Sequence, residues 1–291
     1  LIRVILLKQI IFIFQILITV EKLTRWTNYY YIFFCYSCYI GWEFVPIVHN
    51  FQRYDNFVNI TTRLEIVVHF WLPFDYEYNF NNWIIAQIAS FYCGFIAVTI
   101  IAMFDTINLS FIFHIIGHIK IFKHQVKSMF MENMTQEEIK CKIIEMAQYY
   151  NFILETLKNV EAAFGFNVAS IYLHNLFGGG LFIYQISKST EFGTMVTYGL
   201  MIPLYMGVLL AISFSLEYVR IVADDVPDLI YSLNWENMSV SNQTMILLVL
   251  FQSQTILEFK AAFNMKTGMQ PALNILKTTF SYYVMIKSRD E

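Results

Sequence analysis

Charged residues are scarce in this sequence: they make up 14% of its 291 positions, against about a quarter of an ordinary globular chain. The 19 basic residues are scattered and the formal net charge is only −3, so a nucleic-acid-binding protein is excluded for want of a basic patch. Linkers rich in proline, glycine and serine are also missing, and nothing therefore divides the chain into separate domains. We expect residues 1–291 to form one domain.

Motifs of catalysis and cofactor binding are missing as well. The sequence has no glycine-rich phosphate loop, no nucleophile elbow and no paired acid and base, and the run Gly178 to Gly180 lies inside an apolar stretch instead of following a strand. We therefore predict no catalytic residue, no cofactor and no enzyme activity.

The cysteines and histidines give little support for a metal site. Cys35 and Cys38 form a Cys-x-x-Cys pair inside an apolar segment, where thiols act as small apolar side chains. His114 and His118 have a spacing that can bind zinc, but no cysteine or clustered carboxylate accompanies them. We expect no metal.

Apolar side chains are abundant, at 57% of residues with a mean hydropathy of +0.50. A helix needs about 20 apolar residues to cross a bilayer, and six segments reach or approach that length. The sequence thus predicts an all-α membrane protein with six spans, at residues 4–20, 29–48, 83–113, 162–186, 192–216 and 268–286. A short apolar stretch at 244–257 is expected to form a cytoplasmic helix before the last span.

The distribution of lysine predicts the orientation of the spans. The densest basic cluster lies between residues 120 and 142, and basic connections remain in the cytoplasm. The C-terminus is then outside, as is the stretch from His49 to Asn82, where Asn59 begins an Asn-Ile-Thr glycosylation sequon. The first span would begin outside, almost at residue 1, which leads us to expect that one helix of a seven-helix protein is missing.

Aromatic residues give the best indication of function, with 28 Phe, 19 Tyr and 5 Trp. Aromatic and methionine side chains lining a gap between helices suit small, apolar, volatile ligands. Topology alone places the candidate ligand-binding residues in the outer half of the bundle: Trp42, Trp83, Gln87, Phe91, Tyr198, Met201 and Tyr205. A buried amide needs a partner, which for Gln87 is either the ligand or a structural hydrogen bond.

Three stretches, in order and spacing, resemble insect odorant receptors. They are "HFWLPFDYEYNFNNWIIAQIASFY" (residues 69–92), "ADDVPDLIYSLNWENM" (223–238) and "GMQPALNILKTTFSYYVMI" (268–286). Residues 69–92 resemble the family's Pro-Phe-acid-Tyr segment, and residues 223–238 resemble its Ile-Tyr…Trp signature. The likeness covers about the last three quarters of the chain.

This resemblance implies a seven-helix protein of inverted topology relative to G-protein-coupled receptors. It also implies an odorant-gated, non-selective cation channel, assembled with a coreceptor as a heterotetramer in the plasma membrane of a sensory-neuron dendrite. The last helix would line the pore, with Met285 as a hydrophobic gate and Ser288 just above it. Lys277 lies eight residues before Met285, roughly 12 Å deeper along the helix.

Three other classes stay open at this point. A gustatory receptor shares the fold, but its usual Thr-Tyr-x-x-x-Gln-Phe tail is absent from the sequence. A multi-helix transporter would call for internal repeats or paired broken helices, and a G-protein-coupled receptor would place the C-terminus inside.

Overall fold

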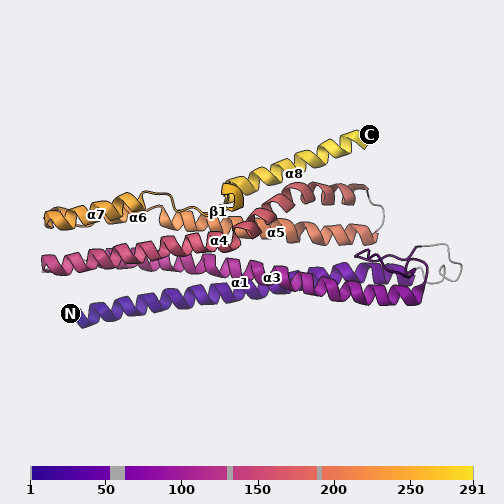
Figure 1. The fold of residues 1–291 in the computed structure, drawn as a ribbon, viewed down its shortest axis with the longest axis horizontal. Helices are drawn as coiled ribbons and strands as arrows, with labels where there is room; N and C mark the ends of the chain where they lie inside the picture. Colours follow the sequence, from indigo (N-terminus) through magenta and orange to yellow (C-terminus); the bar gives the residue numbers. More distant parts are fainter. Residues whose placement is uncertain (1, 53–62, 130–133, 189–191, 291) are drawn as a thin grey trace. The chain divides into compact units, whose positions relative to one another are not determined.

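The structure of the chain, a computed structural model, describes residues 2–52, 63–129, 134–188 and 192–290 and is almost entirely α-helical (Figure 1). Five long helices dominate it: α1 (Ile2–Gln52), α3 (Phe80–Lys127), α4 (Gln136–Lys188), α5 (Phe192–Ala223) and α8 (Met269–Asp290). The shorter elements are α6 (Val226–Tyr231), η1 (Trp235–Asn237), α7 (Val240–Ser253), β1 (Lys260–Ala261), η2 (Ala262–Asn264) and β2 (Met265–Lys266). Asn59, the predicted glycosylation site, lies outside the described residues.

Helix α1 corrects the predicted division of residues 4–48 into two spans. Both segments belong to this one unbroken helix of 51 residues, about 75 Å long. Residues 21–28 join them without glycine or proline, and Arg25 pairs with Glu21 one turn before it at 2.5 Å. The charged residues therefore continue the helix and do not form a turn. Residues 4–20 therefore form no separate helix and continue into the helix that contains the predicted span at 29–48.

Three helical stretches among the described residues are long and apolar enough to cross a membrane: Ile10–Phe51, Phe80–Lys127 and Met195–Asn237. They include the predicted spans at 29–48 and 83–113, and all but the first three residues of the one at 192–216. The predicted span at 162–186 is the second half of α4, and the one at 268–286 corresponds to α8. The cytoplasmic helix expected at 244–257 is α7, which begins and ends four residues earlier.

The chain forms two compact units, which the long helices share. The first consists of Leu1–Thr27, Asn108–Ser170 and Leu210–Ala272, and holds the basic connection predicted to be cytoplasmic. In it, Phe12 of α1 stacks on His124 of α3 with ring centroids 3.7 Å apart, and Phe122 of α3 packs on Tyr150 of α4 at 5.3 Å. Lys123 forms an ion pair with Asp225.

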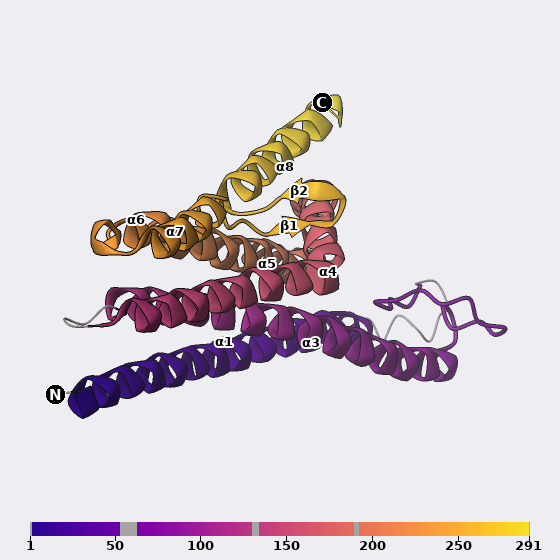
Figure 2. The ribbon, with the colours of Figure 1, turned by 60° about the vertical axis from the view of Figure 1, so that its left-hand side comes forward.

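The sequence that leads into α8 docks on α4 within this first unit. Gln136, the first residue of α4, accepts a hydrogen bond from the Ser239 backbone N–H through Oε1 (2.9 Å) and one from Asn242 through its carbonyl (3.0 Å). The short β1–β2 hairpin follows α7 (Figure 2), and the Lys260 backbone N–H donates to Glu161 of α4 at 2.7 Å. The segment from Ser239 to Lys260 is thus held against α4 at both of its ends.

The second unit consists of Asn28–Ile107, Ile171–Leu209 and Leu273–Glu291. Polar side chains link α1 to α3 along this unit, since Tyr31 donates to Asp105 at 2.5 Å and the Tyr36 hydroxyl lies 2.8 Å from that of Thr99. Such pairs satisfy polar groups that would otherwise be costly in an apolar surrounding. The parts of α1, α4 and α5 that belong to this unit frame the cavity described next.

Among the residues that the structure describes, no group of three or more His, Cys, Asp or Glu could hold a metal ion. The cysteines and histidine considered as metal ligands instead pack against other side chains. Cys35 and Cys38 are buried free thiols. His118 lies with Nδ1 2.9 Å from the Tyr149 hydroxyl, and its ring packs edge-on against Phe152 with centroids 5.4 Å apart. Cys35 and Cys38 therefore belong to the core, and His118 is half-buried against α4.

Candidate functional site

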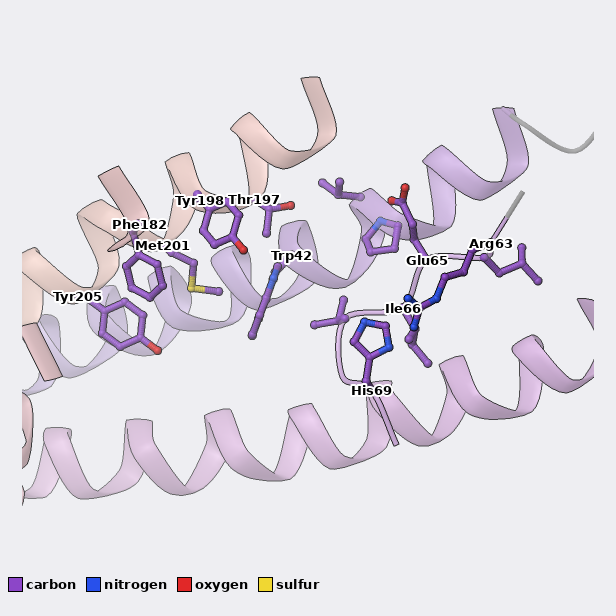
Figure 3. Close-up of a pocket in the computed structure, with 14 residues that line it drawn as sticks. Trp42, Arg63, Glu65, Ile66, His69, Phe182, Thr197, Tyr198, Met201 and Tyr205 are labelled. Atoms are coloured by element: carbon purple, nitrogen blue, oxygen red, sulfur yellow. The ribbon is translucent and has the colours of Figure 1, made fainter. Parts of the chain in front are cut away.

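A cavity of about 730 Å³ lies in the second unit, between the C-terminal part of α1, the N-terminal half of α5 and the loop before α3 (Figure 3). Helical spacing brings its lining residues onto common faces, because residues three or four apart share one side of a helix. From α1 come Trp42, Val45 and Pro46, and from α5 come Thr197, Tyr198, Met201 and Tyr205. Helix α4 adds Phe182, and the loop adds residues 63–67 and His69.

One end of the cavity is aromatic. Phe182 packs against Tyr198 and Tyr205 with centroid distances of 5.9 and 5.5 Å, and Tyr205 also packs on His174 of α4 at 4.3 Å. Met201 is buried beside them. Stacked and tilted rings at these distances offer a shaped apolar wall, suited to the hydrocarbon part of a small ligand.

The other end is polar and is organised around Glu65. The Glu65 backbone N–H donates to the Asn50 side chain at 2.9 Å, while its carbonyl accepts from Asn50 Nδ2 at 2.7 Å and from Trp83 Nε1 at 2.8 Å. The carboxylate lies 2.8 Å from His49 Nδ1. These contacts attach the loop to the ends of α1 and α3 and hold a carboxylate at the cavity.

Four of the seven sequence-predicted ligand residues line this cavity together, namely Trp42, Tyr198, Met201 and Tyr205. The spacing of 198, 201 and 205 accounts for three of them, because it places their side chains on one face of α5.

Trp83, Gln87 and Phe91 do not line the cavity. The Trp83 indole is buried and holds the loop through Glu65, and Phe91 is 45% exposed, with its carbonyl accepting from Tyr39. Gln87 makes the structural hydrogen bond that was the alternative to ligand contact, since Nε2 donates to the buried Glu43 at 2.9 Å. Its Oε1 is buried without a partner.

Sequence reasoning missed Phe182 and the loop from Arg63 to His69. Phe182 lay inside a predicted span and carried only its aromatic character as a signal. The loop carries no signal at all, because its approach to α5 depends on tertiary contacts through Asn50 and Trp83.

Comparison with known proteins shows the family of this chain. The model of the family described as 7tm odorant receptor matches residues 13–280, most of the chain. The chain belongs to the 7tm odorant receptor family. The protein is thus a multi-pass membrane receptor and not an enzyme, and the match favours this class over the gustatory receptor, transporter and G-protein-coupled receptor alternatives.

Solved structures show the same fold at low sequence identity. The olfactory receptor OR5 of Machilis hrabei in complex with eugenol superposes with a TM-score of 0.75 at 13% identity, over 94% of this chain and 69% of that one. OR5 in a second structure gives a TM-score of 0.74 at 14% identity, over 94% and 68% of the two chains. A search of the curated proteins finds no match. The predicted all-α receptor fold is confirmed.

The receptor's α8 presents the three residues predicted for the pore on one exposed face. Lys277, Met285 and Ser288 are all exposed, and their spacing places them on one side of the helix. Thr279 lies on the packed side, 1% exposed, and donates to the Asn175 carbonyl of α4 at 3.1 Å. Helix α8 therefore packs against its own chain on one side and is exposed on the other.

Proposed function

We propose that the receptor binds small, volatile, largely apolar molecules in the cavity of Figure 3 and thereby gates a non-selective cation channel. The channel would be assembled with a coreceptor in the plasma membrane of a sensory-neuron dendrite, as expected from the resemblance. The observation that carries this proposal is that α4 contacts the cavity and α8 within a single stretch of its sequence, residues 174–182.

On the cavity side, α4 supplies Phe182 to the wall, and His174 packs on Tyr205 with centroids 4.3 Å apart. A ligand that displaces either ring acts directly on α4. Because packed side chains interdigitate at high density, such a displacement is passed on to their neighbours.

On the other side, two glycines of α4 let side chains of α8 pack directly against the α4 backbone. A Cβ built on Gly179 would lie 2.9 Å from Thr279 Cγ2, and one built on Gly180 would lie 2.7 Å from Tyr282 Cδ1. The hydrogen bond from Thr279 to the Asn175 carbonyl holds the same interface. A movement of α4 would therefore shift α8 directly, because the two helices are in close contact.

The exposed face of α8 supports its assignment to a pore between subunits. We propose that Met285, 46% exposed, forms the hydrophobic constriction and that Ser288 lies just above it. Lys277 would face the wide cytoplasmic vestibule or a side portal, because a cationic side chain at the constriction would oppose the passage of cations. The similar fold of OR5, solved with eugenol, supports capture of a small molecule by this fold.

The experiment compares the truncation of an aromatic residue that lines the cavity with the truncation of one that does not. With a coreceptor coexpressed, Tyr205→Ala should shift the half-maximal odorant concentration by roughly 2- to 12-fold, since one aromatic contact is worth about 0.5–1.5 kcal/mol. Phe91→Ala removes a ring that does not line the cavity and should leave the dose response unchanged. The proposal fails if the two variants shift the response equally, or if neither does while currents persist.

A further inference from the structure

The aromatic end of the cavity presents hydrogen-bond donors that have no partner in the protein. They belong to the tryptophan and the two tyrosines of the lining, Trp42 of α1 and Tyr198 and Tyr205 of α5 (Figure 3). Among the residues that the structure describes, none forms a hydrogen bond with the Trp42 indole N–H or with either tyrosine hydroxyl. All three side chains are half-buried, so a ligand that fills the cavity removes solvent from their polar atoms.

Comparable side chains elsewhere in the chain do have partners. The Trp83 and Trp235 indoles donate to backbone carbonyls at 2.8 and 3.0 Å. The hydroxyls of Tyr39 and Tyr76 also donate to backbone carbonyls, at 2.5 and 3.0 Å. Indole N–H and tyrosine hydroxyl groups usually find a partner when they are buried. The unpaired groups of the cavity therefore point to a ligand as their partner.

The chemistry of these three groups specifies what the ligand must carry. An indole N–H is a donor only, whereas a tyrosine hydroxyl can donate or accept. Together they offer three hydrogens and only two acceptor oxygens, so this wall lacks an acceptor. A carbonyl oxygen supplies two lone pairs and adds no donor, whereas an alcohol brings a further hydrogen that itself needs an acceptor. A hydrocarbon would leave the Trp42 N–H desolvated and unpaired, which is unfavourable.

We infer that the cavity is selective for small apolar carbonyl compounds, namely ketones, aldehydes and esters, whose oxygen accepts a hydrogen bond from the Trp42 indole N–H. This inference rests on the proposal that the cavity binds ligand. It assigns Trp42 as the residue that selects for the acceptor, because its N–H has no other role. The hydrocarbon part of the ligand packs against Phe182 and Met201, which line the same end.

The test is the binding of three ligands with one skeleton to the purified receptor in lipid nanodiscs, measured by equilibrium dialysis against empty nanodiscs. Acetophenone, 1-phenylethanol and α-methylstyrene carry a carbonyl, a hydroxyl and a methylene group at the same carbon. Acetophenone should bind about 2- to 12-fold more tightly than 1-phenylethanol, which is the range for one neutral hydrogen bond. Equal or tighter binding of the alcohol, or no binding of the ketone, overturns the inference.

Two tryptophan variants test whether the preference arises at Trp42. Trp42→Phe keeps an aromatic ring and removes the N–H, and it should weaken acetophenone binding by about 2- to 12-fold relative to the binding of α-methylstyrene. The hydrocarbon has no acceptor, so its affinity reports the lost ring contact and the integrity of the variant. Trp71→Phe makes the same change at a side chain that is 93% exposed and outside the cavity lining, and should leave both affinities unchanged. An equal loss for ketone and hydrocarbon in Trp42→Phe refutes the role of Trp42.

Currents recorded in parallel with a coreceptor test the proposed function separately. Selective binding of the ketone without an evoked current would leave the ligand class standing and refute gating. Evoked currents of equal potency for ketone and alcohol, unchanged in Trp42→Phe, would do the reverse.

Discussion

Replacing Gly180 by alanine tests the contact between α4 and α8. The added Cβ would lie 2.7 Å from Tyr282 Cδ1 and 3.3 Å from the Thr279 carbonyl oxygen, so at least the first contact is closer than real Cβ atoms tolerate. Tyr282 or α8 must then move by several tenths of an ångström. Overpacking of this kind costs about 1–3 kcal/mol, which corresponds to roughly 5- to 150-fold in an equilibrium that depends on this interface.

Gly207→Ala is the matched control, because a Cβ on Gly207 meets nothing within 4 Å. We expect Gly180→Ala to change the ratio of unliganded to maximal current by at least fivefold at equal surface expression. Gly207→Ala should leave that ratio unchanged. Indistinguishable currents from the two alanine variants would refute transmission through the glycine contact, whatever their absolute size.

Two further predictions concern α8 and the buried carboxylate of α1. In α8, Met285→Ala should raise the unliganded leak current by loosening the hydrophobic constriction, and Lys277→Gln should alter conductance only modestly. An unchanged leak current in Met285→Ala, together with strongly changed ion selectivity in Lys277→Gln, would reverse the two assignments. In α1, Glu43→Ala should lower the thermal unfolding midpoint, because the buried Gln87 amide and Ser90 hydroxyl lose their hydrogen-bond acceptor. Each unpaired group costs about 1–3 kcal/mol. Glu43→Gln should cost less than half as much, because its new amide can also donate to the unpartnered Gln87 Oε1, and equal loss of stability in both variants would contradict this account.

Residues 4–48 illustrate how far sequence reasoning reached within a single helix. Apolar composition correctly predicted helices in a membrane protein, because the bilayer leaves few other ways to satisfy the backbone. The division of these residues into two separate helices was wrong, since hydropathy cannot distinguish charged residues in a turn from charged residues within a continuous helix. The unbroken hydrogen bonding of α1 and the pair of Arg25 with Glu21 decided between them.

The sequence by itself determined the class of the protein and the faces of its helices. Family-like stretches and 3.6-residue periodicity placed Tyr198, Met201 and Tyr205 together, because these are local properties of one helix. Only the tertiary structure decided which faces meet: it turned Gln87 towards Glu43 and brought the loop of Glu65 to the aromatic wall. Those contacts join residues far apart in the chain, and their geometry depends on the packing of several helices at once.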